Sequence, residues 1–293
     1  MPPTGSADRV VSAHPISQHS NPPSRHRGAR RILTIVVVIG LWLMGLALAG
    51  PGLAGVASGT PAYAAPPPGL AVTGHESGVR IAPVAQILED PQRRMTNGWR
   101  AIDGDTVTLP ISGTVWWVRF SLVNTTSATV RSIIDLGTAQ QDYASWYVLE
   151  PDGRLLLENH TGDRLAFDSR LLAHRDLTLP LWVPANETRE IYLRLDSHDG
   201  LFAMMPLRLY DLSSFFAAST REGLLLSLFH GGLVSLAVFN LLLFISTRQT
   251  QIGLYVLHLL AFLLAGASFR GFTFQYLWPG SPAFHNMVTV SSV

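Results

Sequence analysis

Alternation of apolar and polar positions, the pattern of a strand with one buried face, recurs through residues 66–211. The run 115–123 shows it best, because its even-numbered residues are all apolar: Trp116, Val118, Phe120 and Leu122. The odd-numbered positions Trp117, Arg119 and Ser121 would point to the opposite side. Short runs of this kind, separated by Gly, Pro and Asn turns, predict an all-β domain at 66–211.

Turn residues divide the rest of this region into further strands. Pro151-Asp152-Gly153 lies between the runs 143–149 and 155–157, and this arrangement predicts a hairpin. A second turn, Pro184-Ala185-Asn186, separates the runs 177–183 and 191–195, and a final strand is expected at 206–210. Many short strands in a domain of this size favour a β-sandwich or jelly roll.

The pattern changes near residue 222, where alternation gives way to unbroken apolar runs. Residues 223–245 and 252–269 carry no charged side chain, and each run is long enough to cross a bilayer as a helix. We therefore expect transmembrane helices at 222–246 and 252–269, antiparallel because the link between them is short. A loop is expected at 270–286, followed by the start of a third, truncated helix at 284–293.

The N-terminal region predicts export of the β domain. Residues 1–31 are polar and end in a basic cluster, which favours a disordered cytoplasmic leader. The apolar run that follows leads to Ala62-Tyr63-Ala64, a motif of the kind that signal peptidase cleaves. Residues 32–65 are therefore either a cleaved signal peptide or an uncleaved anchor, and both alternatives place the β domain outside the cytoplasm.

Composition narrows the function classes. Only 14% of residues are charged and 47% are hydrophobic, which fits a chain partly embedded in lipid. With a net charge of +1, the chain has no broad positive potential that would attract nucleic acid. The absence of cysteine excludes disulfides and thiolate chemistry. No nucleophile, metal-protease or phosphate-loop motif occurs, so we expect no enzyme, cofactor or metal. Carboxylate spacing alone leaves a glycosidase open.

Polar and aromatic side chains of the β domain are candidates for ligand contact. Arginine and histidine can hold a carboxylate or sugar hydroxyls, aspartate can accept from them, and aromatic faces can stack on a sugar ring. The candidates are Trp117, Arg119, Tyr147, Asp163, His174, Arg175 and Arg194. The alternative for Arg119 and Arg194 is cross-strand pairing or exposure on the polar face of a strand.

Several motifs in order along the chain resemble one receptor family. In the β domain they are Trp117-Val118-Arg119-Phe120, Thr161-Gly162-Asp163, His174-Arg175, Leu179-Pro180-Leu181 and Tyr192-Leu193-Arg194. In the apolar region they are residues 240–244, 254–257 and 274–279. Together they resemble the type 2 extracellular domain and the first helices of bacterial seven-transmembrane receptors with diverse intracellular signalling modules (7TMR-DISM).

The resemblance implies a jelly roll similar to carbohydrate-binding modules, which senses a ligand and signals through seven helices to a cytoplasmic kinase or cyclase. Only two complete spans and no such output motif occur here, so we expect a fragment of a receptor in a bacterial inner membrane, with the β domain in the periplasm. Expected partners are a small molecule or carbohydrate, membrane lipid and a second copy of the chain. The alternative function is a membrane-anchored adhesion or assembly module that contacts protein or cell wall.

Overall fold

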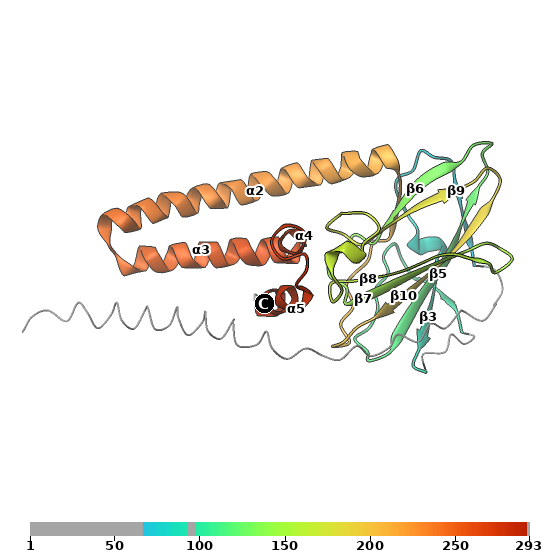
Figure 1. Cartoon of the computed structure of the whole chain (residues 1–293), viewed down its shortest axis with the longest axis horizontal. Helices are drawn as coiled ribbons and strands as arrows, with labels where there is room; N and C mark the ends of the chain where they lie inside the picture. The colour runs from blue at the N-terminus through green and yellow to red at the C-terminus, as the bar shows by residue number, and fades with distance from the viewer. Residues whose placement is uncertain (1–66, 93–97, 292–293) are drawn as a thin grey trace, which may run out of the picture. The chain divides into compact units, whose positions relative to one another are not determined.

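Two β-sheets packed face to face form one domain, and apolar helices follow it (Figure 1). The structure is a computed structural model that describes residues 67–92 and 98–291. The leader expected at 1–31 and the signal or anchor expected at 32–65 lie outside the described residues.

The larger sheet has the strand order β4-β3-β5-β10-β7-β8, with β1 parallel to β5. Its strands are β1 (Gly69–Val72), β3 (Gln86–Asp90), β4 (Arg100–Ala101), β5 (Val115–Asn124), β7 (Tyr143–Leu149), β8 (Leu155–Thr161) and β10 (Thr188–Asp196). The smaller sheet has the order β2-β11-β6-β9. Its strands are β2 (Ser77–Arg80), β6 (Val130–Asp135), β9 (Thr178–Val183) and β11 (Arg208–Asp211). Two 3-10 turns, η1 (Ala82–Val84) and η2 (Phe167–Ser169), complete the domain.

The core lies between the two sheets and consists of their inward-facing side chains. The even-numbered residues of β5 enter this core as predicted, and Trp116 and Phe120 are completely buried. Ile134 of β6, Leu179 of β9 and Leu209 of β11 face them from the smaller sheet and are completely buried as well. The expectation of an all-β sandwich followed by apolar helices is therefore confirmed.

The predicted hairpin is present, because β7 and β8 pair antiparallel across the turn at residues 151–154. The turn at 184–186, in contrast, does not join two strands of one sheet. The strand before it, β9, pairs with β6 in the smaller sheet, while the strand after it, β10, pairs with β5 and β7 in the larger sheet. This turn therefore carries the chain from one sheet to the other.

The first helix, α2 (Leu212–Thr247), is longer than the span expected at 222–246. It starts directly after β11, where the carboxylate of Asp211 accepts hydrogen bonds from the backbone N–H of Ser213 (2.8 Å) and of Ser214 (3.0 Å). A carboxylate at this position satisfies N–H groups that have no partner within the helix. Helical structure therefore begins at the end of the strand, well before the apolar run.

The second helix, α3 (Thr250–Phe269), returns antiparallel to α2 (Figure 1). A Cβ atom at Gly253 would lie 2.7 Å from the Phe244 ring, so the helices are in close contact near their connection. Both have the length and composition of membrane spans, with mean hydropathies of 2.1 and 2.0, and few of their apolar residues are buried. Side chains this apolar and this exposed are suited to a lipid environment.

The segment expected as a loop at 270–286 is partly helical, and a helix also covers most of 284–293, where a third one was expected to start. The chain forms two further helices there, α4 (Phe272–Tyr276) and α5 (Pro282–Ser291). Phe274 of α4 and His285 of α5 are each 1% exposed and their rings stack with centroids 4.6 Å apart. The sequence signal was weak because these helices are short and bury mixed aromatic and polar residues.

Candidate functional site

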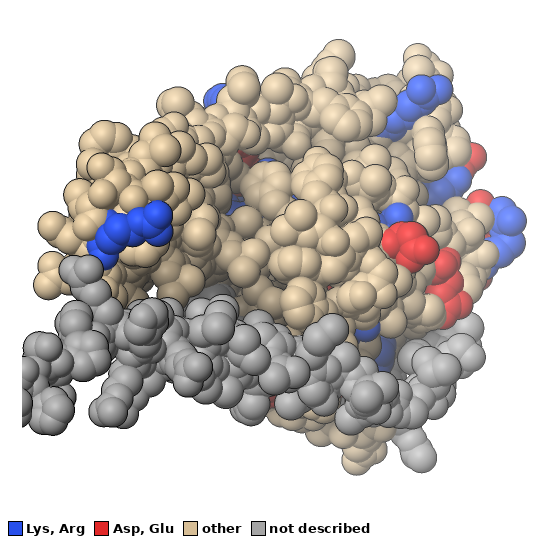
Figure 2. All heavy atoms as spheres, turned by 60° about the vertical axis from the view of Figure 1, so that its left-hand side comes forward, with Lys and Arg blue, Asp and Glu red and all other residues tan. Residues whose placement is uncertain are grey.

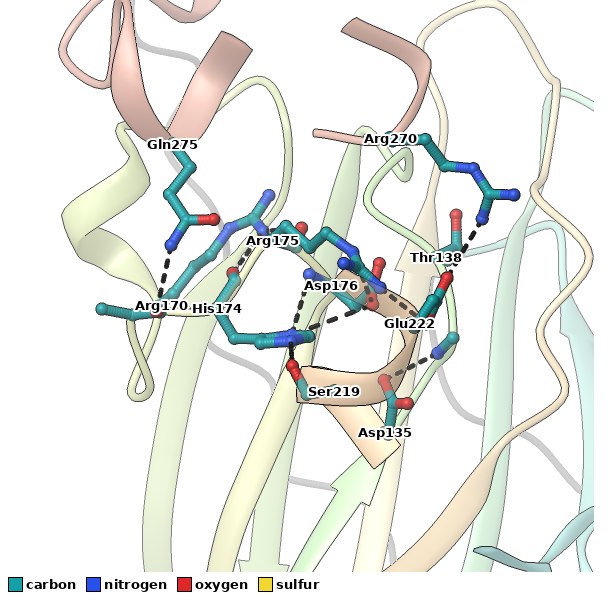
Figure 3. Close-up of polar contacts among 12 residues, drawn as sticks. Asp135, Thr138, Arg170, His174, Arg175, Asp176, Ser219, Glu222, Arg270 and Gln275 are labelled. Carbon is teal, nitrogen blue, oxygen red and sulfur yellow. Dashed lines mark hydrogen bonds and ion pairs between the residues drawn. The ribbon is translucent and has the colours of Figure 1, made fainter. Parts of the chain in front are cut away.

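A cavity of about 300 Å³ lies where the smaller sheet meets the first turns of α2, and we call it the junction pocket. Charged side chains from both sides line it, as Figure 3 shows for several of them. The lining residues from the β domain are Asp135, Gly137, His174, Arg175, Asp176, Pro206, Arg208 and Tyr210. Those from the helices are Phe215, Ala218, Ser219, Glu222 and Arg270.

The turn after β6 shapes one wall of the junction pocket. Asp135, the last residue of β6, accepts a hydrogen bond at Oδ1 from the backbone N–H of Gly137 (2.9 Å). Gly137 has a φ of +68°, and a Cβ atom there would lie 2.4 Å from the ring of Pro206. Glycine is needed at this position because both the backbone conformation and the close approach exclude a side chain.

His174 connects the β domain to α2 through a defined neutral tautomer. Its Nδ1 accepts a hydrogen bond from the backbone N–H of Asp176 (3.1 Å), so the ring proton is on Nε2 and is donated to the Ser219 hydroxyl (2.9 Å). Burial, together with the nearby Arg175 guanidinium, lowers the pKa of His174 to about 4. The imidazole is therefore uncharged at neutral pH and acts as a hydrogen-bond bridge.

Arg175 makes a charged connection to the same helix. Its Nη2 lies 2.6 Å from Oε2 of Glu222 on α2, and its Nε lies 3.4 Å from Oδ2 of Asp176 (Figure 3). Arg270, at the end of α3, contacts the other Glu222 oxygen at 3.3 Å. Glu222 therefore lies between two arginines, one from the β domain and one from the second helix.

Two carboxyl groups of the junction pocket hold their protons more tightly than usual. Burial raises the pKa of Asp135 to about 7, and repulsion from Asp176 adds to the effect. Burial also raises the pKa of Asp176, although Arg175 opposes this change. Acids with raised pKa values and arginines within one cavity are the mixture of donors and acceptors that a polar ligand requires.

A buried arginine, Arg170, holds the loop that supplies His174 and Arg175. Its Nη1 donates hydrogen bonds to the carbonyl oxygens of both residues, at 2.9 Å for His174. The guanidinium lies over the rings of Phe167 (4.7 Å) and of Phe274 on α4 (5.6 Å). Burial lowers the pKa of Arg170 to about 10, so the side chain remains charged at neutral pH. The cation–π contact with Phe274 joins the pocket loop to the helices.

Asp163 lies on a neighbouring loop and does not line the junction pocket. Its backbone carbonyl accepts a hydrogen bond from the Asn286 side chain of α5 (3.2 Å). Burial raises the pKa of its carboxyl to about 7, with Asp142 as a further cause. Its Oδ1 is buried without a hydrogen-bond partner among the described residues.

The remaining candidates lie together on the outer face of the larger sheet. Trp117 and Tyr147 were expected to form an open stacking platform, but they are only 5% and 4% exposed. Their ring centroids are 5.7 Å apart, and Trp117 donates its indole N–H to the carboxylate of Asp90 (3.1 Å). This face therefore buries its aromatic rings against one another instead of presenting them to solvent.

Arginines border this aromatic cluster. Arg119 is 5% exposed and lies over the ring of Trp99 at 4.2 Å, while its Nε donates to the Gln86 side chain (2.9 Å). Arg194 forms an ion pair with Asp196 at 2.9 Å. Arg119 thus contacts a side chain of β3, and Arg194 contacts a residue of its own strand, β10.

The structure therefore separates the sequence candidates into different places. His174 and Arg175 reach the junction pocket, Asp163 lies on an adjacent loop, and the other four lie on the outer face of the larger sheet. Sequence reasoning missed several lining residues: Asp135, Asp176, Arg208, Glu222 and Arg270. The available signal was the occurrence of charged residues at the ends of apolar segments, where strands and helices meet.

The pocket has the groups to bind a polar molecule, and two of its acids, Asp176 and Glu222, pair with arginines. Among residues 67–92 and 98–291, no cluster of three or more His, Cys, Asp or Glu side chains could hold a metal ion. The arginines, carboxyl groups and His174 that line the cavity offer recognition by charge and hydrogen bonding.

Comparison with known protein families gives two matches that follow each other along the chain. Residues 81–211 match the model described as 7TMR-DISM extracellular 2, and residues 222–293 match the model described as 7TM diverse intracellular signalling. Both models describe receptor or sensor regions. The search of curated proteins finds no match to the chain.

Proposed function

We propose that this chain, which belongs to the 7TMR-DISM receptor family, binds a small molecule in the junction pocket and relays its occupancy from the extracellular β domain to α2. The single observation that supports this most directly is the composition of the pocket walls. His174 and Arg208 come from the β domain, whereas Ser219 and Glu222 come from the helix that enters the membrane. A ligand in the pocket would touch both parts at once.

Such a position is suited to signalling because a ligand changes a conformational equilibrium only by binding one state better than another. In the structure as described, Arg175 pairs with Glu222 and His174 bonds Ser219. A ligand that offers a carboxylate to Arg175 or a hydroxyl to His174 competes with these contacts. Binding would therefore favour a different packing of α2 on the β domain.

The connection to the membrane is direct. Strand β11 lies between β2 and β6 in the smaller sheet, and α2 begins at the next residue after it. Asp211 fixes this change from strand to helix through its capping hydrogen bonds. With no linker between them, movement of β11 must also move the start of α2.

The ligand class follows from the size and lining of the pocket. About 300 Å³ is at the lower end of the range for small-molecule sites, and guanidinium and carboxyl groups suit a small acid or a carbohydrate. We place the receptor in the inner membrane of a bacterium as a multi-pass protein, with its β domain in the periplasm, because the family is a bacterial receptor family.

Thermal unfolding of the full chain in nanodiscs, with a panel of sugars and organic acids, tests the proposal. A ligand of the folded state should raise the unfolding temperature, and Arg208→Gln should weaken that response. Arg80→Gln is the matched control, since Arg80 lies on the neighbouring strand outside the pocket with its side chain 44% exposed.

No response to any compound, together with retention of the protein on cell-wall material, would instead favour an adhesion or assembly module. A relay needs a further measurement, the distance between spin labels at Arg131 on β6 and Leu242 on α2. Leu242 is 61% exposed, so a label there does not disturb packing within the described residues. If a bound ligand leaves this distance unchanged, the pocket binds without relaying.

A further inference from the structure

One end of the β domain faces the helices, and we call it the membrane-proximal end. Three contacts define it: Asp163 accepts from Asn286, Phe167 donates its backbone N–H to the carbonyl of Pro279 (2.9 Å), and Arg175 pairs with Glu222. All three join loops at this end of the sheets to α2, to α5 or to the segment between α4 and α5. The lipid surface crossed by the helices therefore lies on this side of the domain.

Two more loops belong to the same end. The backbone N–H of His198 donates to the carboxylate of Asp142 (2.6 Å), and the N–H of Asp163 donates to the carbonyl of Gln141 (2.9 Å). These bonds connect the loop after β10 with the loop that contacts α5. The loop before β5 joins them, since Ser112 donates its N–H to the carbonyl of Gly200 (3.0 Å).

Large apolar side chains project into solvent from these two loops. Ile111 is 77% exposed, Leu201 is 56% exposed and Met204 is 66% exposed. The next residue, Met205, is 1% exposed and forms an isolated antiparallel β-bridge with Val107 in the core. Because successive side chains of extended backbone point to opposite sides, Met204 points outward. We call Ile111, Leu201 and Met204 the apolar loop patch.

The apolar loop patch has no cationic side chain in its two loops. Residues 108–114 and 197–205 contain no arginine, and the whole chain contains no lysine. The nearest charged residue in sequence is Asp199, whose carboxylate accepts from the backbone N–H of Leu201 (3.1 Å) and from the Ser197 hydroxyl (2.8 Å). The nearby cation Arg164 is paired with the Asp142 carboxylate (3.0 Å), so attraction of this surface to a membrane would depend mainly on apolar burial.

We propose that the apolar loop patch inserts into the outer surface of the bilayer that α2 and α3 span. The patch lies beside the contacts with the helices, because its loops share hydrogen bonds with the loop that contacts α5. In Figure 2 the left of the view is mostly uncharged apart from one basic group, while most acidic and basic groups lie on the right. Insertion would attach the β domain to the lipid itself, in addition to its contacts with the helices, and would fix its tilt.

The absence of cysteine in the chain permits a direct test. Single cysteines at Ile111, Leu201 or Met204 are labelled with an environment-sensitive fluorophore, and the full chain is reconstituted in phosphatidylcholine vesicles. The matched control is Trp182→Cys, since Trp182 is 57% exposed and apolar but lies on β9 at the opposite end, beside Val183. Unchanged thermal unfolding of each labelled variant establishes that it is folded.

In vesicles, we expect the emission maxima of the three patch probes to lie at shorter wavelength than that of the probe at 182. Spin-labelled lipid should quench the patch probes several-fold more than the probe at 182. High salt should leave this difference unchanged, since the contact is apolar. Equal exposure of all four probes to aqueous iodide would overturn the proposal. Shielding from iodide without lipid quenching, increasing with protein density, would also overturn it, because the patch would then contact a second copy.

Discussion

Arg175 of the β domain and Glu222 of α2 form an ion pair with 2.6 Å between Nη2 and Oε2. The two side chains differ in environment, since that of Arg175 is 6% exposed and that of Glu222 is 46% exposed. Arg175 also lies over the ring of Phe272 at 5.3 Å. One buried cation therefore contacts α2 and α4 from the loop that precedes β9.

Replacing these partners should have unequal effects. Glu222→Gln removes a half-exposed charge, and we expect a loss of about 1 kcal/mol or less in the free energy of unfolding. Arg175→Met should cost more, because it also removes the contacts with Asp176 and Phe272. Hydrogen exchange at residues 215–225 should increase in both variants, and a double-mutant cycle measures the coupling.

A matched pair elsewhere provides the control for this prediction. Arg80 and Asp105 lie 3.5 Å apart with their side chains 44% and 65% exposed, and neither lines the junction pocket. Arg80→Gln should change neither the stability nor the exchange at 215–225 measurably. An equal effect of Arg80→Gln and Glu222→Gln would mean that the Glu222 pair does not hold α2 to the β domain.

The helix cap at Asp211 gives a second prediction. Asp211→Ala removes two hydrogen bonds to the first turn of α2 and should destabilise the protein by about 1 kcal/mol, whereas Asp211→Asn should retain most of the cap. Urea unfolding followed by circular dichroism measures the difference. A loss as large for Asp211→Asn as for Asp211→Ala would rule out the capping role.

The same cap predicts a dependence on pH. Burial acts to raise the pKa of Asp211, but the hydrogen bonds from Ser213 and Ser214 outweigh it and lower the pKa to about 2. A carboxyl whose pKa is lower in the folded state stabilises above its unfolded value, near 3.9, and this contribution is lost as the pH falls toward 2. The difference in stability between wild type and Asp211→Ala should therefore shrink across that range.

Asp135 should show the opposite dependence. Because its pKa is raised from 3.8 to about 7, the folded protein binds this proton more tightly than the unfolded chain does. Its ionisation therefore lowers stability as the pH rises from about 4 to about 7. Asp135→Asn keeps an oxygen to accept from Gly137 and should gain stability over wild type as the pH rises, measured as the difference in unfolding temperature.

Other groups do not obscure this comparison. Asp163 and Asp176 have raised pKa values as well, and His174 has a lowered one, so the wild-type profile combines several contributions. The difference between wild type and Asp135→Asn isolates one of them. A constant difference between pH 4 and pH 8 would show that Asp135 titrates normally.

Gly271, between α3 and α4, gives a steric prediction. It has a φ of +74°, and a Cβ atom there would lie 2.7 Å from the Cβ of Ala139 and 3.1 Å from the carbonyl of Arg175. Gly271→Ala should therefore destabilise by more than about 1 kcal/mol and loosen the helices from the β domain. Limited proteolysis of the helices and urea unfolding measure these effects. Gly280→Ala, which has no atom near the added Cβ, should have little effect in either measurement.

The sequence predicted two kinds of element: strands with one buried and one polar face, and long helices without charge. Strand β5 alternates because one of its faces enters the core, and the apolar runs in α2 and α3 lack charge because they suit lipid. Strand β6 was missed because Ser132 and Ile133 are buried as well as Ile134, which removes the alternation. On the outer face, Phe215 of α2 packs against Ile133 and Tyr210 and explains this burial.

The site was less predictable, since it forms only where separate elements meet. His174 and Arg175 were identified as an adjacent pair, but nothing local in the sequence indicates that Asp135, far earlier in the chain, lies beside them. Trp117 and Tyr147 were expected to be accessible because a two-residue period marks one face as outer. That period does not show that neighbouring aromatic rings cover each other there.

The length of α2 has a mechanical consequence. Thirty-six residues at the usual rise make a rod about 54 Å long, well beyond the roughly 30 Å of a hydrocarbon layer. The rod contains no proline, and its outer turns rest on the sheet through Phe215. Torque applied to those turns would reach Thr247 on the far side of the bilayer, and the glycines at 223, 231 and 232 are the positions where the helix is more flexible.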